Sequence, residues 1–463
     1  MAFATTNPYT GETVKTFEEA TPAEIDAAVG RAHAAFLRWR ETSFEQRAQV
    51  LRRAAELLRA KPREYAQILT LEMGKLIGEA EAEVELCAKI LDYYVQHGAK
   101  AMGPRYLPAE GFGETDVQLV KEPLGVLFAV EPWNFPFYQV IRITAPQATA
   151  GNAIVLKHAA NVPQSALAME QLFRDAGAPD GLLTNLFVSH DNVERVVADP
   201  RVRGVALTGS ERAGSAVAAL AGKYMKKSTL ELGGADAFIV LSDADVAQAA
   251  KWAAFGRHWN AGQVCVSSKR IIVEAPVYDQ FLEHYRAGVA ALKAGDPMDP
   301  ATTLAPLSSQ GARDGLARQV EEAIANGAKA ETLGAPVPTQ GAFYQPTLLT
   351  GITADNPAYR TEFFGPVSQV YRVADEDEAI KLANDSPYGL GGSVFSQDTE
   401  RAKRVAARLE TGMVYINQPT GVKADITFGG VKNSGYGHEL IDLGLTEFIN
   451  EKVVVVTDIH GSF

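Results

Sequence analysis

Cys265 is the residue of this sequence best suited to nucleophilic chemistry. It follows Gly262-Gln263-Val264, and glycine permits backbone geometries that bring a side chain close to a ligand. A thiolate is the strongest nucleophile that a protein offers near neutral pH, provided that its pKa is lowered and it is partly exposed. The alternative is a small buried residue, as we expect for Cys87 in a helical stretch. Taken alone, Cys265 fits the buried alternative better, so its surroundings must decide.

Two polar residues could support such a thiol. Glu231 precedes a Leu-Gly-Gly turn, and partial burial would raise its pKa into the range of a general base. It could also be a solvated charge at a bend of the chain. Asn134 lies between Trp133 and Phe135, and its amide could stabilise the negative charge of an oxyanion in this apolar setting.

The elements that must position these residues are parallel strands. Three predicted strands end at candidate ligand-binding residues: 125–130 before Trp133-Asn134, 153–157 at Lys157, and 205–208 before Gly209-Ser210. Ligands bind beyond the carboxyl ends of parallel strands, although each of these residues alone is more simply a turn residue. Gly209-Ser210 before a helix could hold a phosphate. Phosphate binding here would be atypical, because neither Gly-x-Gly-x-x-Gly nor Gly-x-x-x-x-Gly-Lys occurs.

Other catalytic chemistries have little support. The eight histidines show no metal-ligand spacing and there is no Cys-x-x-Cys, so we expect no metal site. Gly-x-Ser-x-Gly is also absent, which argues against a serine hydrolase of the usual α/β type.

Length and composition limit the class of protein. At about 150 residues per domain, 463 residues predict two or three domains. The net charge of -12 makes nucleic acid and anionic membranes poor partners. Two distant cysteines cannot build a disulfide framework, which indicates a reducing compartment, and we expect the cytoplasm. The N-terminus lacks the pattern of a signal peptide, and no apolar run approaches the ~18 residues of a membrane helix.

Periodicity divides the chain into a helical first quarter and a longer part in which strands and helices alternate. Helices are predicted from a capping box at Thr21, from Ser43, from Pro62 and over 79–96. The later alternation predicts βαβ units and a parallel sheet. The further predicted strands are 115–120, 186–188, 237–241, 270–273 and 412–417, and the further helices are 162–175, 193–198 and 246–255.

The tail of the chain predicts an element of assembly. Residues 451–456 form a predicted strand with no later strand to pair with, and such an edge aggregates unless it is covered or paired. Together with 115–120, it predicts an arm used in oligomerisation, within a homodimer or a homotetramer.

Six short motifs occur in a fixed order along essentially the whole chain. They are Pro132-Trp-Asn-Phe-Pro136, Thr208-Gly209-Ser210, Glu231-Leu-Gly-Gly234, Gly262-Gln-Val-Cys265, Glu362-Phe-Phe-Gly-Pro366 and Phe428-Gly-Gly430 through Ser434-Gly435. This ordered set resembles the aldehyde dehydrogenase superfamily. It is far more specific than any one motif, and it reverses the interpretation of Cys265.

The resemblance implies a fold and a division into domains. We expect an α/β fold with a Rossmann-like NAD(P)-binding domain made of residues 1–104 and 124–232. An α/β catalytic domain would follow over 233–443. A small β oligomerisation arm would consist of 105–123 and 444–463.

The resemblance also implies a reaction, the NAD(P)-dependent oxidation of an aldehyde to a carboxylic acid. Cys265 would attack the aldehyde, Asn134 and the Cys265 N–H would hold the oxyanion, and Glu231 would activate the water that hydrolyses the thioester. The cofactor contacts would be Lys157 to the adenosine ribose, Ser210 to the phosphates and Glu362 to the nicotinamide ribose, with Trp133, Leu232, Gly209 and Phe364 lining the cofactor site.

Within the family, the sequence most resembles the short bacterial succinate-semialdehyde dehydrogenases. The cues are Leu156-Lys-His-Ala-Ala-Asn-Val-Pro163, Ile416-Asn-Gln-Pro419 and Lys423-Ala-Asp425. We therefore expect oxidation of succinate semialdehyde to succinate, with another small aliphatic aldehyde or semialdehyde as the alternative. Arg142, about two helical turns beyond Asn134, could pair with a substrate carboxylate beside Tyr138, or it could form an ordinary ion pair.

Two positions depart from patterns of the family. Many NAD-preferring relatives carry a glutamate three residues after the ribose lysine, and here that position is Ala160. Without a carboxylate that repels a 2′-phosphate, we expect use of NADP, and use of NAD stays open. Ser267 stands where some semialdehyde dehydrogenases have a second cysteine, which excludes a local disulfide switch.

Two other functions stay open at this point. A CoA-acylating semialdehyde dehydrogenase would commonly lack the hydrolytic base, and the presence of Glu231 argues against it. A non-catalytic binding protein would have lost part of the set formed by Cys265, Glu231 and Asn134.

Overall fold

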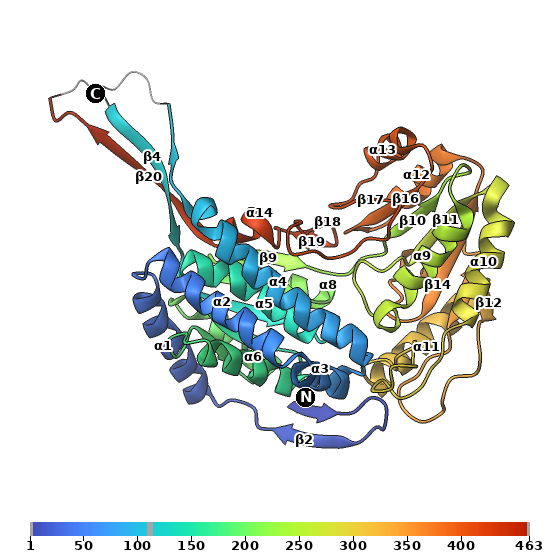
Figure 1. Ribbon diagram of the computed structural model, residues 1–463, viewed down its shortest axis with the longest axis horizontal. Helices are drawn as coiled ribbons and strands as arrows, with labels where there is room; N and C mark the ends of the chain where they lie inside the picture. Colours follow the sequence, from blue (N-terminus) through green and yellow to red (C-terminus); the bar gives the residue numbers. More distant parts are fainter. Residues whose placement is uncertain (1–2, 109–113, 461–463) are drawn as a thin grey trace.

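A computed structural model describes residues 3–108 and 114–460 of the chain. Two α/β lobes lie side by side, and a β ribbon projects from one of them (Figure 1). Both lobes are built on sheets of mainly parallel strands, which confirms the predicted α/β class.

The first lobe contains a sheet with the strand order β19-β9-β8-β5-β6-β7. These strands are β5 (Val126–Glu131), β6 (Ala153–His158), β7 (Leu183–Asn185), β8 (Val202–Thr208), β9 (Lys227–Glu231) and β19 (Gly435–Tyr436). The central strands β5 and β6 are buried almost throughout, which explains their continuous apolar sequences. Val130 pairs with both Lys157 and Leu207, so β5, β6 and β8 end at one edge of the sheet.

Helices pack around this sheet and share its hydrophobic core. They are α1 (Pro22–Trp39), α2 (Phe44–Ala60), α3 (Pro62–Met73), α4 (Ile77–Met102), α5 (Pro136–Ala150), α6 (Pro163–Asp175), α7 (Val193–Ala198), α8 (Glu211–Lys223) and α14 (Ile441–Thr446). The capping box at Thr21 is confirmed, since Thr21 and Glu24 exchange hydrogen bonds at the start of α1. The predicted starts at Ser43 and Pro62 are confirmed as well, whereas α4 extends beyond both ends of the predicted 79–96.

The second lobe contains a sheet with the strand order β12-β13-β14-β11-β10-β16-β17. Its strands are β10 (Ala237–Val240), β11 (Arg270–Glu274), β12 (Lys329–Thr332), β13 (Thr347–Thr350), β14 (Val367–Val373), β16 (Gly392–Phe395) and β17 (Tyr415–Ile416). Its helices are α9 (Val246–His258), α10 (Tyr278–Ala290), α11 (Gln310–Ala325), α12 (Glu376–Asn384) and α13 (Thr399–Ala406).

The projecting ribbon joins β4 to the end of the chain (Figure 1). Its strands are β3 (Arg105–Tyr106), β4 (Glu114–Pro123) and β20 (Ile449–Thr457), in the order β20-β4-β3. Of the predicted arm, residues 109–113 and 461–463 lie outside the described residues. Smaller pairs are the N-terminal hairpin of β1 (Phe3–Thr6) and β2 (Thr13–Phe17), and β15 (Tyr388–Gly389) with β18 (Val431–Lys432).

Two predicted strands are wrong in position or length. The strand predicted over 186–188 is found at β7, which ends at Asn185. Leu186 N–H still donates to Leu156 O of β6 at 2.8 Å, whereas Phe187 O accepts from Ala20 N–H outside the sheet. Phe187 packs instead against Phe3 and Phe17 of the N-terminal hairpin, so the apolar run reflects burial and not strand pairing. The strand predicted over 412–417 shrinks to β17, a short edge strand beside β16.

Candidate active site

The ends of the strands bring the candidate residues of the first lobe together. Asn134 lies in the turn between β5 and α5, and Glu231 is the last residue of β9. Thr208 pairs with Glu231, which sets the ends of β8 and β9 side by side. Ser210 caps α8 by accepting a hydrogen bond from Ala213 N–H at 3.3 Å, so its hydroxyl stands at a helix N-terminus.

A cavity of about 260 Å³ lies at these strand ends. Most of its lining consists of residues singled out from the sequence, and they come from both lobes: Trp133, Asn134, Gly209, Ser210, Leu232, Cys265, Glu362 and Phe364. The other lining residues are Pro132, Gln139, Thr208 and Gly233. A Cβ added to Gly209 would meet Leu207 at an ordinary 3.6 Å, so the protein's own packing leaves this space open.

A second cavity of about 750 Å³ adjoins the first, and Trp133 lines both. Lys157 and Ala160 line this larger cavity. Burial lowers the pKa of Lys157. We refer to these two neighbouring cavities, with Cys265 on the wall of the first and Lys157 on the wall of the second, as the groove.

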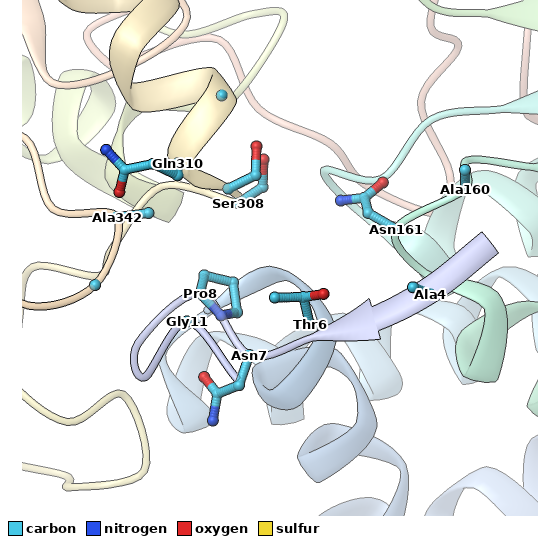
Figure 2. Close-up of a pocket in the computed structure, with 13 residues that line it drawn as sticks. Ala4, Thr6, Asn7, Pro8, Gly11, Ala160, Asn161, Ser308, Gln310 and Ala342 are labelled. Atoms are coloured by element: carbon cyan, nitrogen blue, oxygen red, sulfur yellow. The ribbon is translucent and has the colours of Figure 1, made fainter. Parts of the chain in front are cut away.

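A third hollow of about 410 Å³ continues the groove beyond Ala160. Ala160 and Asn161 face Ser308 and Gln310 across it, and Thr6 of the N-terminal hairpin closes one side (Figure 2). The small side chain of Ala160 leaves this passage open.

The loop that carries Cys265 has an unusual backbone. Asn260 and Ala261 have φ of 51° and 53°, a left-handed region that costs a residue other than glycine about 1–3 kcal/mol. Gly262 follows with φ of 77°, and a Cβ added there would overlap Gly365 O. Glycine is therefore required at 262, and the loop presents the half-buried Cys265 at the cavity wall.

Both positively and negatively charged side chains act on the pKa of the Cys265 thiol. Burial raises its pKa to about 12, and the positive charges of Lys269 and Arg142 oppose that rise. The carboxylates of Glu231 and Asp236 add to it. The thiol is protonated at neutral pH in this resting arrangement, so nucleophilic attack requires removal of its proton.

Asn134 is tied to the Cys265 loop. Its Nδ2 donates to Gln263 O at 3.1 Å, and its backbone O accepts from Asn260 Nδ2 at 2.9 Å. A side-chain amide carries two N–H groups, so one more can be donated in the cavity. A buried, preoriented amide of this kind can stabilise negative charge on a reacting oxygen.

Glu231 is buried at the end of β9 without any compensation by hydrogen bonds. Within the described residues, neither of its carboxyl oxygens has a hydrogen-bond partner. Burial raises its pKa to about 8, while the charge of Arg142 acts in the opposite direction. A carboxyl with this pKa can exchange a proton near neutral pH.

Arg142 and Tyr138 lie on α5 behind the cavity wall. The Arg142 guanidinium donates to Tyr138 Oη at 3.3 Å and to Thr208 Oγ1 at 2.9 Å. Its Nε stands 3.9 Å from Glu439 Oε2 and has no hydrogen-bond partner within the described residues. Neither Arg142 nor Tyr138 lines the Cys265 cavity in this part of the chain. The ion pair left open by the sequence is therefore present, although one donor stays free.

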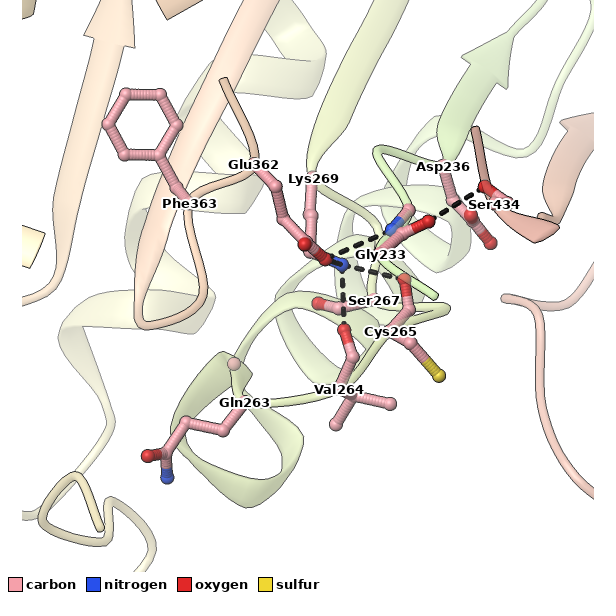
Figure 3. Close-up of polar contacts among 12 residues, drawn as sticks. Gly233, Asp236, Gln263, Val264, Cys265, Ser267, Lys269, Glu362, Phe363 and Ser434 are labelled. Atoms are coloured by element: carbon pink, nitrogen blue, oxygen red, sulfur yellow. Dashed lines mark hydrogen bonds and ion pairs between the residues drawn. The ribbon is translucent and has the colours of Figure 1, made fainter. Parts of the chain in front are cut away.

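Lys269 is a site residue that sequence reasoning missed. Its Nζ donates to Val264 O at 2.7 Å and to Cys265 O at 2.6 Å, and it lies 2.9 Å from Glu362 Oε1 (Figure 3). The only signal in the sequence is its position four residues after Cys265.

Two absences are established for residues 3–108 and 114–460. No group of three or more His, Cys, Asp or Glu side chains there could hold a metal ion. In that same part of the chain, every helix is too short or too polar to cross a membrane.

Comparison with known proteins identifies close relatives. The chain is 52% identical to the succinate-semialdehyde dehydrogenase [NADP(+)] of Deinococcus radiodurans over 452 residues, which cover 98% of this chain and 94% of the relative. It is 46% identical to the enzyme of the same name from Mycobacterium avium, with 98% and 96% covered. A crystal structure of succinic semialdehyde dehydrogenase from Streptococcus pyogenes in complex with NADP+ matches with a TM-score of 0.96 and 47% identity, with 99% of this chain and 100% of that chain covered.

The aldehyde dehydrogenase family as a whole matches over almost the full length. Its sequence model covers residues 1–454. This match and the identities above show that the chain belongs to the aldehyde dehydrogenase family.

Proposed function

We propose that this protein oxidises succinate semialdehyde to succinate with NADP+, through a thioester on Cys265. The observation that carries the proposal is the single cavity that joins the Cys265 thiol, the Asn134 amide and the Glu362 carboxylate. Succinate semialdehyde and NADP+ are favoured because they appear in the names of the relatives from Deinococcus radiodurans and Streptococcus pyogenes.

The groove fits a dinucleotide. Ser210 and the N-terminus of α8 would hold the phosphates, Glu362 the nicotinamide ribose and Lys157 the adenosine ribose, with Trp133 between the two ends. When bound, the nicotinamide supplies the acceptor for a hydride. The hollow beyond Ala160 leaves room for a 2′-phosphate, which favours NADP+.

Attack on the aldehyde begins with loss of the thiol proton of Cys265. Glu231 takes this proton, because its carboxyl is unpartnered and its charge acts on the thiol. The sulfur then forms a bond to the aldehyde carbon, and the C=O electron pair moves onto the oxygen. The free amide N–H of Asn134 and the backbone N–H of Cys265 hold the resulting oxyanion.

Hydrolysis frees the acid from the protein. Once the thiohemiacetal carbon has lost its hydride, its C=O bond re-forms as a thioester. Glu231, after losing its first proton to solvent, takes a proton from a water molecule whose oxygen attacks the thioester carbon. The C–S bond then breaks with its electron pair on sulfur, and Lys269 and Arg142 stabilise the returning thiolate of Cys265.

A carboxylate-bearing aldehyde would be recognised by Arg142. Its guanidinium is permanently charged and acts on the pKa of the Cys265 thiol. Its Nε is a buried donor without a hydrogen-bond partner in the described part of the chain. Arg142 is not among the described residues that line the cavity, so a substrate carboxylate would reach it only after side chains of the cavity wall move. A substrate carboxylate would then complete a charge-assisted hydrogen bond.

The proposal assigns a role to each segment of the chain. We assign residues 1–104 and 124–232 to cofactor binding, 233–443 to catalysis, and 105–123 with 444–463 to a homo-oligomeric arm. The three larger sheets follow these boundaries except at β19, which lies within 233–443 and pairs with β9 of the first lobe. A free catalytic thiol also favours the reducing cytoplasm.

Steady-state reduction of NAD+ and NADP+ tests the function. Each cofactor is assayed with succinate semialdehyde and with butanal, an uncharged aldehyde of the same length, on the wild type, Cys265→Ala and Arg142→Leu. We expect a preference for succinate semialdehyde and NADP+, no turnover by Cys265→Ala, and a rise in KM in Arg142→Leu that is about tenfold larger for succinate semialdehyde than for butanal. Full turnover by Cys265→Ala would refute the thioester route. Equal effects of Arg142→Leu on both aldehydes would refute the role of Arg142.

A further inference from the structure

Lys269 is a buried lysine whose donors all point to the nucleophile loop and to Glu362. The residue is 1% exposed. An ammonium group has three N–H donors, and here the partners are Val264 O, Cys265 O and Glu362 Oε1 (Figure 3). A buried charge is tolerated only when it is paired in this way.

The contact with Val264 O acts on the backbone of the nucleophile. The C=O of Val264 and the N–H of Cys265 belong to one planar trans peptide, in which the two groups point in opposite directions. The ammonium group therefore sets the direction of the Cys265 N–H, and its charge on the carbonyl oxygen makes that N–H a stronger donor. Within the described residues, the Cys265 N–H donates no hydrogen bond, so a reacting oxygen can use it.

The contact with Glu362 joins the nucleophile loop to the cofactor side of the cavity. Glu362 Oε1 also accepts from Gly234 N–H at 3.1 Å, so this oxygen is held by two donors. The carboxylate lines the same cavity as Cys265. Lys269 therefore contacts both the Val264–Cys265 peptide and the Glu362 carboxylate, which belong to segments far apart in the sequence.

We propose that Lys269 is a positioning residue for the oxidation: its ammonium group aims the Cys265 N–H at the oxyanion and holds Glu362 in place for the nicotinamide ribose. This role rests on the proposed function, because it requires Cys265 to be the nucleophile.

The charge of Lys269 also acts on the thiol. It opposes the effect of burial on the pKa of Cys265, and it does so more strongly than Arg142. Loss of this charge would leave the thiol harder to ionise. The other ionisable groups around the thiol are Glu231 from β9, Asp236 from the loop before β10, and Tyr138 and Arg142 from α5.

Lys269→Met is the main test, because methionine keeps an apolar stem and removes the charge. The rate at which iodoacetamide alkylates Cys265 is measured across pH in the protein without cofactor or substrate, with mass spectrometry to locate the label. We expect the midpoint of alkylation to rise by about one pH unit, since a nearby opposite charge shifts a pKa by roughly one to three units. The buried Cys87 serves as the unreactive internal reference.

Kinetics give a second readout. The first-turnover rate of NADPH formation should fall about tenfold in Lys269→Met, which corresponds to one unit of thiol pKa. Glu362→Gln is the opposing variant, because it removes the negative partner of Lys269 and keeps the size of the side chain. There, Cys265 should alkylate at least as readily as in the wild type, while NADP+ binds more weakly.

Lys251→Met, on the exposed side of α9, is the matched control for loss of a lysine and should alkylate like the wild type. An unchanged first-turnover rate of NADPH formation in a folded Lys269→Met variant would overturn the proposal, and an unchanged alkylation midpoint would overturn the effect of its charge on the thiol. If that variant does not fold, a rise of the midpoint in Glu362→Gln would overturn it instead. Cys265→Ala separates the two proposals, because full activity there refutes the thioester route, whereas alkylation judges Lys269 alone.

Discussion

Glu231 carries much of the proposed chemistry, and its properties come from burial. A carboxylate in water has a pKa near 4.3, whereas the interior around Glu231 raises this value to about 8. Neither oxygen has a hydrogen-bond partner within the described residues, so no local contact favours the charged form. Arg142 is the group that opposes the rise, and it keeps the carboxyl able to ionise near neutral pH.

Glu231→Gln should halt the proposed reaction at the thioester. Glutamine keeps the volume but cannot take a proton from water, so steady-state kcat should fall about 10²- to 10⁴-fold. Because Glu231 also takes the Cys265 thiol proton in the proposed mechanism, rapid mixing should show a stoichiometric burst of NADPH that forms more slowly than in the wild type, and intact mass should show the acyl-enzyme. In the wild type, kcat should rise with pH through about 8, because the base works when deprotonated. Glu194→Gln, on α7, is the control, and full turnover by Glu231→Gln would exclude Glu231 as the base.

Ala160→Glu should reverse the expected preference for NADP+. A carboxylate at the hollow between Ala160 and Ser308 would repel a 2′-phosphate and weaken NADP+ binding about 10- to 100-fold, with a smaller effect on NAD+. Fluorescence titration with each cofactor measures the two dissociation constants. Ala160→Gln adds the same volume without charge, so equal losses in both variants would show that size, and not charge, decides.

At the scale of elements, α5 depends on a carboxylate from a neighbouring helix. The first N–H groups of an α-helix have no partner inside the helix, and α5 has no side-chain cap of its own. Glu83 of α4 supplies the acceptor, with Phe137 N–H at 2.9 Å and Tyr138 N–H at 3.0 Å. Lys75 pairs with its other oxygen, and both side chains are fully buried. The turn that carries Asn134 ends directly at this cap.

Glu83→Ala should destabilise the protein and displace Asn134. It leaves the Lys75 charge unpaired in the interior, and removing one partner of a buried ion pair costs about 3–5 kcal/mol of unfolding free energy. Urea denaturation followed by fluorescence measures this change. Glu83→Gln keeps an acceptor for the helix N–H groups, so it should retain more of the wild-type kcat than Glu83→Ala. An alanine variant as stable as the wild type would contradict this account of α5.

At the scale of the whole molecule, the projecting ribbon is the feature that a lone chain does not explain. β4 and β20 extend away from both lobes (Figure 1). Val453 and Val455 on β20 are 54% and 50% exposed. A few strands without a covering layer are barely stable in water. We therefore expect another subunit to cover the ribbon.

The double variant Val453→Lys with Val455→Lys should weaken self-association. Lysine on an edge strand opposes pairing with another chain, and here it also removes apolar contact area. Sedimentation velocity over a range of concentrations should show the mass shift toward that of one chain. Val14→Lys, an equally exposed valine on the distant strand β2, is the control. A double variant with the wild-type mass would place the subunit contact elsewhere.

The sequence by itself determined the features that depend on neighbouring residues. The capping box at Thr21 predicts the start of α1, and the apolar runs 125–130 and 153–157 predict β5 and β6. The ordered motifs lead to the family and to the residues that the structure gathers in one cavity with Cys265. Such signals are local because helix caps, buried strands and ligand-binding turns each require particular residue types at fixed short spacings.

Only the tertiary structure decided which distant groups act on one another. It placed Lys269 on the peptide of Cys265, Glu83 at the start of α5, and Glu439 beside Arg142. These residues carry no pattern of their own, since lysines, glutamates and arginines most often lie on surfaces. Their roles arise because folding removes them from water and leaves each charge to be balanced by whichever partner the packed chain brings within a few ångströms.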